Sequence, residues 1–264
     1  MKMPTAVSKE FLENLYRTHH RIENLDPDPL LFARGFDDPA EGETAGLIAA
    51  GFAYGRVEKI VETLGRIFAE LGPSPRRAIL TEPPQHWSEV FADFAYRFHK
   101  GPDLALFLLL LRRAVEKHGS LRALFEEGDR GDQGEALSAF SGTILGGDCR
   151  PILRTRDLPH GHPVRHLLAS PATGGAAKRL CLYLRWMSRR DALDPGYWLG
   201  AVDPARLVVP LDTHVARVGR QLGFTGRSAS DWKTAREITE GLRRFDPADP
   251  LRYDFSLFRY GMGQ

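Results

Sequence analysis

A short apolar run at residues 207–223, LVVPLDTHVARVGRQLG, ends where a helix must begin. The run stops at Pro210 and Leu211, so Asp212 occupies the first position available to cap the next helix. Asp is among the best N-cap residues and would accept hydrogen bonds from the free amides that follow it. Taken alone, the pattern favours this structural interpretation of Asp212. A second group of residues upstream makes a chemical interpretation worth weighing beside it.

That group lies at residues 170–187, SPATGGAAKRLCLYLRWM, where Gly174 and Gly175 turn the chain into a helix. Lys178 and Arg179 fall in its first turn. Backbone amides at such a glycine turn and helix start can hold a phosphate group. The field of the helix start disfavours an ammonium ion, which is one route to an amine nucleophile at Lys178. The alternative is that Lys178 is an exposed surface cation.

Other side chains with reactive or ligating groups give weaker signals. The segment DLPHGHPVRH places three histidines close together, and imidazoles at such spacing could bind zinc. Its prolines and the lack of a helical i, i+4 frame favour a polar loop, so we expect no metal site and keep a metal-dependent hydrolase as an alternative. Core packing is the favoured role of four further residues, namely Cys181, Tyr183, Trp186 and Trp198.

The secondary structure around these residues is predicted to be helical. No stretch alternates with a period of two, whereas apolar residues recur at helical spacing throughout the chain. The fold class is therefore predicted to be all-α, with a long loop over 147–172. We expect helices at 9–22, 30–34, 43–54, 56–71, 87–98, 103–118, 120–127, 133–146, 176–190, 213–222, 231–245 and 253–260.

Composition excludes several classes of protein. The chain has 264 residues, of which 42% are apolar, so it can fill a core and is not disordered as a whole. Two cysteines cannot form a disulfide scaffold, a four-cysteine zinc module or a self-contained iron–sulfur cluster. The longest apolar run, residues 104–111, is too short to span a bilayer, and the first residues lack the pattern of a signal peptide. We expect a cytoplasmic protein that does not contact membranes.

Positive charge is concentrated in the second half of the chain. Residues 150–244 contain 17 Lys and Arg against 8 Asp and Glu, although the whole chain has a net charge of only +2. Arginine outnumbers lysine 29 to 7, and its planar fork suits phosphate. The pattern is compatible with a face that binds nucleic acid and with a solvated, arginine-rich surface. If the first holds, we expect arginines of this segment, among them Arg179, Arg185, Arg217 and Arg220, at the rim of the site.

Taken together, these segments resemble a known family. PLDTHVARVGRQLG is similar to the aspartate signature of the helix-hairpin-helix DNA glycosylases, the superfamily of endonuclease III and 8-oxoguanine DNA glycosylase. ATGGAAKRLCLYLRW occupies the place of that family's hairpin and catalytic lysine, although the family prefers Gly-x-Gly where this chain has Gly-Gly-Ala. Residues 45–71 and 91–125 resemble further parts of the fold in the same order. The similarity extends over about 45–260 and points to an uncharacterised bacterial branch, a domain of unknown function.

The resemblance implies a fold, an activity and roles for particular residues. It implies two helical lobes beside a cleft: a barrel lobe at 45–190 with the helix-hairpin-helix, a second lobe at 1–44 plus 207–264, and a connecting insertion at 191–206. Lys178 would attack the sugar of an extruded nucleotide, and Asp212 would stabilise the developing positive charge. Their side-chain ends would then lie within about 4–8 Å of each other. The residues implied to contact DNA are Gly174, Gly175, Arg179, Arg56, Tyr54, His214 and Arg217.

The hypothesis from the sequence is therefore a DNA repair glycosylase with AP lyase activity. It would act on damaged duplex DNA as a monomer and without a cofactor. The alternative is a protein of the same fold that binds DNA or RNA without catalysis, for which a paired Lys178 and Asp212 would be unnecessary. The target base is not specified, because its pocket is assembled from residues far apart in the chain.

Overall fold

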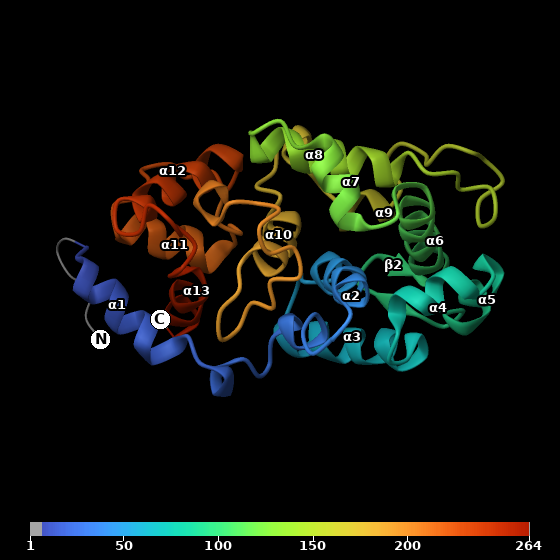
Figure 1. The fold of residues 1–264 in the computed structure, drawn as a ribbon, viewed down its shortest axis with the longest axis horizontal. Coiled ribbons are helices and arrows are strands. Elements are labelled where there is room, and N and C mark those ends of the chain that lie inside the picture. Colours follow the sequence, from blue (N-terminus) through green and yellow to red (C-terminus); the bar gives the residue numbers. More distant parts are fainter. Residues whose placement is uncertain (1–6, 264) are drawn as a thin grey trace. The chain divides into compact units, whose positions relative to one another are not determined.

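The computed structural model of the chain describes residues 7–263, which form two compact units (Figure 1). The central unit comprises Pro27–Ala169, and the terminal unit comprises Met1–Asp26 together with Ser170–Gln264. Both units are helical, and the one sheet among the described residues is a two-stranded hairpin in the central unit. The predicted all-α class is thus confirmed apart from this hairpin.

The central unit is built around one long buried helix. Its elements are the 3₁₀ helix η2 (Pro29–Phe32), α2 (Pro39–Gly51), α3 (Val57–Leu71), α4 (Pro75–Thr81), α5 (Pro84–Val90), β1 (Ala95–Tyr96), β2 (His99–Lys100), α6 (Gly101–His118), α7 (Leu121–Gly128), α8 (Gln133–Leu145) and α9 (Val164–Leu167). Helix α6 packs against α4, α5, α7, α8 and α9. All of its residues from Leu104 to Leu111 are buried, so the apolar run that is too short for a membrane forms the core of this unit.

The hairpin corrects the sequence-based prediction of a helix at 87–98. Helix α5 ends at Val90, and β1 pairs antiparallel with β2, with Ala95 opposite Lys100 and Tyr96 opposite His99. Gly101 follows the hairpin directly, and a side chain there would lie 1.9 Å from the carbonyl oxygen of Phe91. This close backbone approach holds the hairpin against the end of α5. The hairpin is too short for a periodic pattern in the sequence to predict it.

Helix α4 was not predicted, because its stabilising contact comes from a distant part of the chain. The carboxylate of Glu41 accepts hydrogen bonds from the backbone amides of Arg76 and Arg77, at 2.6 and 3.2 Å. In the same way, the carboxylate of Glu43 accepts hydrogen bonds from the backbone amides of Leu121 and Arg122 in α7. Both carboxylates satisfy helix amides that would otherwise lack acceptors.

The terminal unit joins the two ends of the chain around a second core. Its elements are α1 (Lys9–His19), the 3₁₀ helices η1 (Ile22–Asn24), η3 (Pro171–Thr173) and η4 (Pro204–Arg206), and helices α10 (Lys178–Ser188), α11 (Thr213–Gln221), α12 (Trp232–Arg243) and α13 (Asp254–Met262). Helix α13 packs against both α1 and α11 (Figure 1). The apolar run before Asp212 is buried in this core with residues of α1, α11, α12 and α13.

The division into units differs from the predicted lobes. Residues 27–44 belong to the central unit, although they are predicted to lie with the chain ends. Residues 170–206 belong to the terminal unit, so the glycine turn, α10 and the predicted connecting insertion all fold with α11. Lys178 and Asp212 are therefore parts of the same unit.

Candidate functional site

Lys178 is the first residue of α10 and follows an irregular turn. Gly174 adopts φ +83°, a left-handed conformation that favours glycine, and Ala177 adopts φ +49° immediately before the helix. A non-glycine residue in this region is strained, and such strain persists only where the surrounding structure enforces it. Among the described residues no side chain caps α10. The turn therefore places the lysine at a helix start that no described side chain caps.

Asp212 is the N-cap of α11, as the sequence predicts. Its Oδ1 accepts a hydrogen bond from the amide of Val215 at 2.8 Å. The preceding residues, including Val209 and Leu211, are buried in the core of the terminal unit. The amide of Val209 also donates to Oγ1 of Thr239 on α12, at 3.0 Å. Burial and capping together fix the position of the carboxylate.

The second carboxylate oxygen of Asp212 faces the lysine. Nζ of Lys178 lies 3.6 Å from Oδ2 of Asp212. This distance is slightly shorter than the predicted range and longer than a normal hydrogen bond, so the contact is an ion pair. The lysine side chain is 34% exposed and the aspartate 12%. The arrangement leaves the amine accessible beside a fixed carboxylate. Asp212 both caps α11 and pairs with Lys178.

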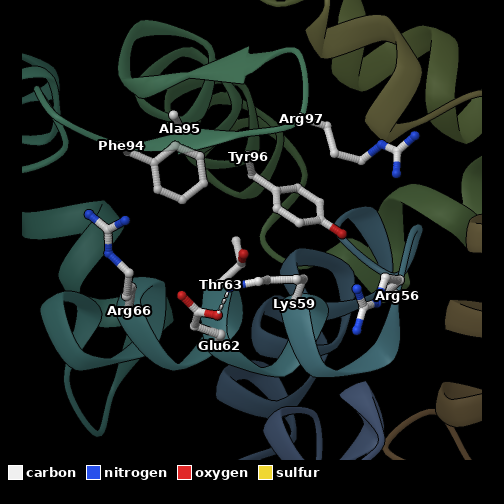
Figure 2. Close-up of a pocket in the computed structure, with 9 residues that line it drawn as sticks. All are labelled: Arg56, Lys59, Glu62, Thr63, Arg66, Phe94, Ala95, Tyr96 and Arg97. Carbon is white, nitrogen blue, oxygen red and sulfur yellow. Dashed lines mark hydrogen bonds and ion pairs between the residues drawn. The ribbon is translucent and has the colours of Figure 1, made fainter.

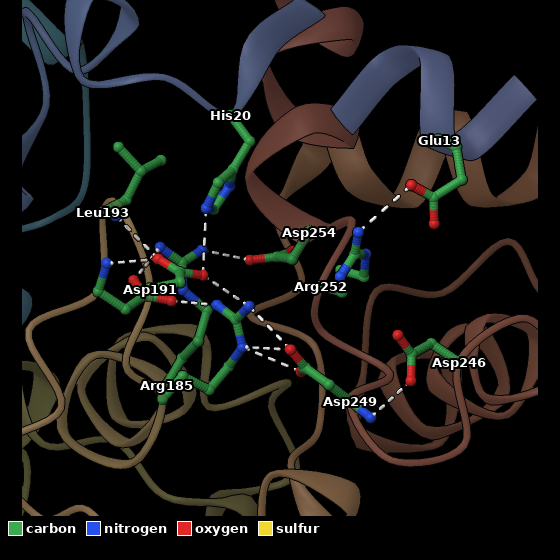
Figure 3. Close-up of polar contacts among 11 residues, drawn as sticks. Glu13, His20, Arg185, Asp191, Leu193, Asp246, Asp249, Arg252 and Asp254 are labelled. Atoms are coloured by element: carbon green, nitrogen blue, oxygen red, sulfur yellow. Dashed lines mark hydrogen bonds and ion pairs between the residues drawn. The ribbon is translucent and has the colours of Figure 1, made fainter. Parts of the chain in front are cut away.

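The other end of α10 lies in a buried network of charges (Figure 3). Arg185 donates to Oδ2 of Asp254 at 2.6 Å and to Oδ1 of Asp194 at 3.0 Å. Arg189 contacts both oxygens of Asp249 at 2.9–3.0 Å and also pairs with Asp194. This network joins α10 to the loop that follows it and to the first residue of α13.

A further carboxylate and a histidine complete the environment of Arg189. Asp191 accepts from Arg189 at 2.8 Å and lies 3.1 Å from Nε2 of His20, which follows α1. Although burial opposes it, the bond from His20 and the charge of Arg189 hold the pKa of the Asp191 carboxyl well below its usual range. The pKa values of Arg185 and Arg189 are raised by the surrounding carboxylates in spite of their burial.

Asp254 titrates in the opposite direction. Burial raises the pKa of its carboxyl to about 6, and the charges of Asp212 and Asp194 add to this effect, whereas Arg185 opposes it. Its Oδ1 is buried without a hydrogen-bond partner in the described part of the chain. Asp212 is thus close enough to the buried network for its charge to contribute to the raised pKa of Asp254.

Helix α13 links the network to the helix that carries Asp212. Gly261 on α13 lies against His214, where an added side chain would come within 3.0 Å of the histidine Cβ. Arg217 donates to the carbonyl of Gly261. His214 also packs edge-on against Phe258, with ring centroids 5.9 Å apart. His214 and Arg217 thus hold α11 against α13.

The prediction that arginines of the basic segment line a rim is wrong for Arg185, which is 4% exposed within the network. Arg179 is also buried, and Arg220 donates to backbone carbonyls of residues 227–229, where it holds the turn between α11 and α12. A sum of charges over a segment does not reveal which cations are buried. The carboxylates that pair with the buried Arg185 and Arg189 are those of Asp191, Asp194, Asp249 and Asp254.

The remaining predicted residues are distributed over both units. Gly174 and Gly175 are exposed, with open space where a side chain would project. Tyr54 and Arg56 belong to the central unit, where the hydroxyl of Tyr54 lies 2.5 Å from Nδ1 of His99. Arg56 precedes α3 and lines a pocket there. Sequence reasoning missed Lys59 and Arg66 of that pocket, although their spacing from Arg56 places all three on one face of a helix.

The histidine-rich loop is held by contacts within the central unit. Nδ1 of His162 lies 3.8 Å from Asp103, and the ring of His166 packs edge-on against Tyr54 and Phe98. Within residues 7–263 no three His, Cys, Asp or Glu side chains come together in a way that could hold a metal ion. The residues that were assigned to core packing, Cys181, Tyr183, Trp186 and Trp198, are all buried.

Comparison with known proteins places the chain in a family. Residues 28–263 match the family model described as a protein of unknown function, DUF2400. The chain belongs to the DUF2400 family. Both units of this DUF2400 chain lie largely within the match, including Lys178 and Asp212. No curated protein and no solved structure matches it. None of the helices described for this DUF2400 protein is long and apolar enough to cross a membrane.

Proposed function

We propose that this protein is a DNA glycosylase with AP lyase activity, in which Lys178 is the nucleophile. The observation that carries the proposal is the 3.6 Å contact between Nζ of Lys178 and Oδ2 of Asp212. These residues are 34 positions apart in the sequence and begin two different helices. The segments that resemble the helix-hairpin-helix glycosylases contain these two residues.

The proposed reaction begins with attack by the neutral amine of Lys178 on the anomeric carbon of an extruded nucleotide. A C–N bond forms to the lysine while the bond to the base breaks, and the base leaves with the electron pair and takes up a proton. The sugar ring then opens, its oxygen accepting a proton, to leave an imine between Lys178 and the sugar. Loss of a proton from the adjacent carbon expels the 3′ phosphate and cleaves the strand.

Asp212 would act through its charge and its fixed position. Its Oδ1 is engaged by the amide of Val215, so Oδ2 remains directed at the amine. A carboxylate held in this way stabilises positive charge that develops on the sugar without reorganising during the reaction. It also offers the lysine ammonium an acceptor for the proton that must leave before attack.

The proposal is tested by trapping the imine. Borohydride reduces an imine to a stable amine, so the wild-type protein should become covalently joined to DNA that carries its lesion or an abasic site. Lys178→Ala should abolish this product, because no amine remains at the site. Asp212→Asn should keep the helix cap but slow base release by about a hundredfold or more. Gel mobility under denaturing conditions measures trapping, and a panel of lesion-bearing duplexes measures base release.

A matched control separates the specific reaction from the reaction of surface amines. Lys233 is an exposed lysine on α12 of the same unit, and Lys233→Ala should trap as well as wild type. Trapping by Lys178→Ala at the wild-type level would exclude this lysine as the nucleophile. If DNA binding persisted in that case without base release, the non-catalytic binding protein would replace the enzyme as the best description.

A further inference from the structure

The central unit carries a cationic pocket that the proposed catalytic pair does not use. It encloses about 300 Å³ between α3 and the β1–β2 hairpin (Figure 2). Phe94 and Tyr96 form its apolar side, and both rings are largely buried. Four cations line it against a single acidic residue, Glu62; they are Arg56, Lys59, Arg66 and Arg97.

The cations form a stripe along one side of the pocket. Arg56 is the N-cap residue of α3, and Lys59 and Arg66 follow it at spacings of three and seven residues, on one face of the helix. Ten residues of helix extend about 15 Å, a length that accommodates more than one phosphate of a nucleic-acid strand. Figure 2 shows Arg66 at one end of the pocket, with Arg56 and Arg97 at the other.

Existing ion pairs leave these cations available. Nε of Arg56 is 3.8 Å from Glu58, and Arg66 is 3.5 Å from Asp93, with highly exposed side chains in both pairs. Exposed pairs of this kind contribute little and exchange partners readily. Lys59 has the tightest partner, Glu62 at 2.6 Å, but it too is on the surface.

Arg97 adds an independent observation. It adopts φ +54°, a conformation that L-residues rarely take and that the fold must enforce. In the described part of the chain it forms no ion pair; its guanidinium lies 5.9 Å from the centre of the Tyr54 ring. Tyr96 donates to the carbonyl of Tyr54, which fixes the hairpin on which Arg97 is presented. The strained turn therefore holds an uncommitted cation at the edge of the pocket.

We infer that this α3–hairpin pocket binds phosphate groups of a nucleic-acid strand, as a contact of the central unit separate from Lys178. The inference rests on the proposed function for its choice of ligand. A nucleic-acid strand fits better than a single small phosphate compound, because the cations are spaced along the helix rather than grouped around one point. Such a contact neutralises phosphates and releases counterions, whatever the base sequence.

The test is the salt dependence of binding to an unmodified, fluorescently labelled duplex, measured by anisotropy. The double variant Lys59→Ala/Arg66→Ala should bind severalfold more weakly at low salt. The slope of log K against log salt should also become shallower by about 1–2, since each lost phosphate contact removes roughly 0.9. Arg130→Ala is the matched control, because Arg130 is an exposed cation of the same unit outside the pocket and should leave the slope unchanged.

The two proposals fail in different ways. If the slope is the same in the double variant and the wild type, and circular dichroism shows that both are folded, the phosphate site is overturned. This holds even if a damaged base is released. If no base is released while the slope changes as expected, the proposed enzymatic activity is overturned and the phosphate site is supported. If inorganic phosphate weakens binding more than its ionic strength explains, and the slope is unchanged, the pocket would instead be assigned to a small phosphate compound.

Discussion

The two ends of α10 carry cation–carboxylate contacts of very different kinds. At its start, Lys178 has one carboxylate partner, Asp212, at 3.6 Å, and a third of the lysine side chain is exposed. At its end, Arg185 and Arg189 are buried and are engaged by several carboxylates at hydrogen-bond distance. Both ends come from the same basic segment of the sequence.

Burial and the number of satisfied hydrogen-bond donors, rather than the number of charges, distinguish the structural contact from the contact that is proposed to be reactive. A buried arginine must have its donors satisfied, because an uncompensated charge in the interior is very costly. Such a network is then committed to holding elements together. The pair at the start of α10 is long and its lysine is partly exposed, so breaking this pair should leave the core undisturbed.

The largest effect should follow from removing the buried arginine. Arg185→Ala leaves Asp194 and Asp254 in the interior without their shared partner, and we expect a loss of about 3–5 kcal/mol in the free energy of unfolding. Urea denaturation followed by circular dichroism measures it. The loss should be smaller at low pH, where Asp254 is protonated.

Arg190 provides the control for this variant, because it lies close in the sequence but is exposed. Arg190→Ala should change the free energy of unfolding by less than about 0.5 kcal/mol. Similar losses for Arg185→Ala and Arg190→Ala would mean that the network does not stabilise the terminal unit, and the contrast between the two ends of α10 would disappear.

An intermediate effect concerns the pH dependence that Asp254 imposes. Burial raises the pKa of this carboxyl to about 6 from an ordinary 3.8, so the native state retains a proton that the unfolded state has lost between those values. Stability contributed by this group is therefore highest below about pH 4, falls as the pH rises to about 6, and is constant above. The fall should be on the order of 2–3 kcal/mol. Asp254→Asn should remove it.

The difference between the wild-type and Asp254→Asn curves isolates this contribution, because other carboxylates act in the opposite sense. Asp191 has a lowered pKa, so its contribution is present above about pH 4 and is lost as the pH falls further. It is retained in both proteins and cancels in the difference. A difference that is flat from pH 4 to 7 would show that Asp254 ionises normally in the folded protein.

Much of the helical fold could be predicted because it depends on local patterns. The helices at 57–71, 121–128 and 213–221 were expected within a few residues, since each has apolar residues at helical spacing and α11 also has the capping Asp212. The hairpin at 95–100 and helix α4 could not be predicted. Their stability comes from the approach of Gly101 to Phe91 and from the carboxylate of Glu41, which are contacts that local spacing does not encode.

The candidate site was predictable to the same extent. Lys178 and Asp212 each begin a helix, which is a local property, and the resemblance suggested that they meet. The buried role of Arg185 was missed, because its neutralisation by Asp194 and Asp254 depends on tertiary contacts with the loop after α10 and with the first residue of α13. The pocket at α3 was missed for a related reason. Its cations do lie at helical spacing, but the hairpin that closes it was not expected.

The smallest effects should arise at the start of α10, where the charges are proposed to serve function. Asp212→Ala removes a helix cap and should lower the free energy of unfolding by about 1 kcal/mol, whereas Asp212→Asn retains an acceptor for the amide of Val215 and should cost only a few tenths. Lys178→Ala should cost less than about 1 kcal/mol, because its ion pair is long and the lysine side chain is partly exposed. Combining Lys178→Ala with Asp212→Asn gives a double-mutant cycle in urea, and we expect a coupling energy below about 1 kcal/mol. A coupling of several kcal/mol would make this pair a structural contact like those of Arg185, and loss of trapping in Lys178→Ala could then be attributed to damaged folding rather than to a missing nucleophile.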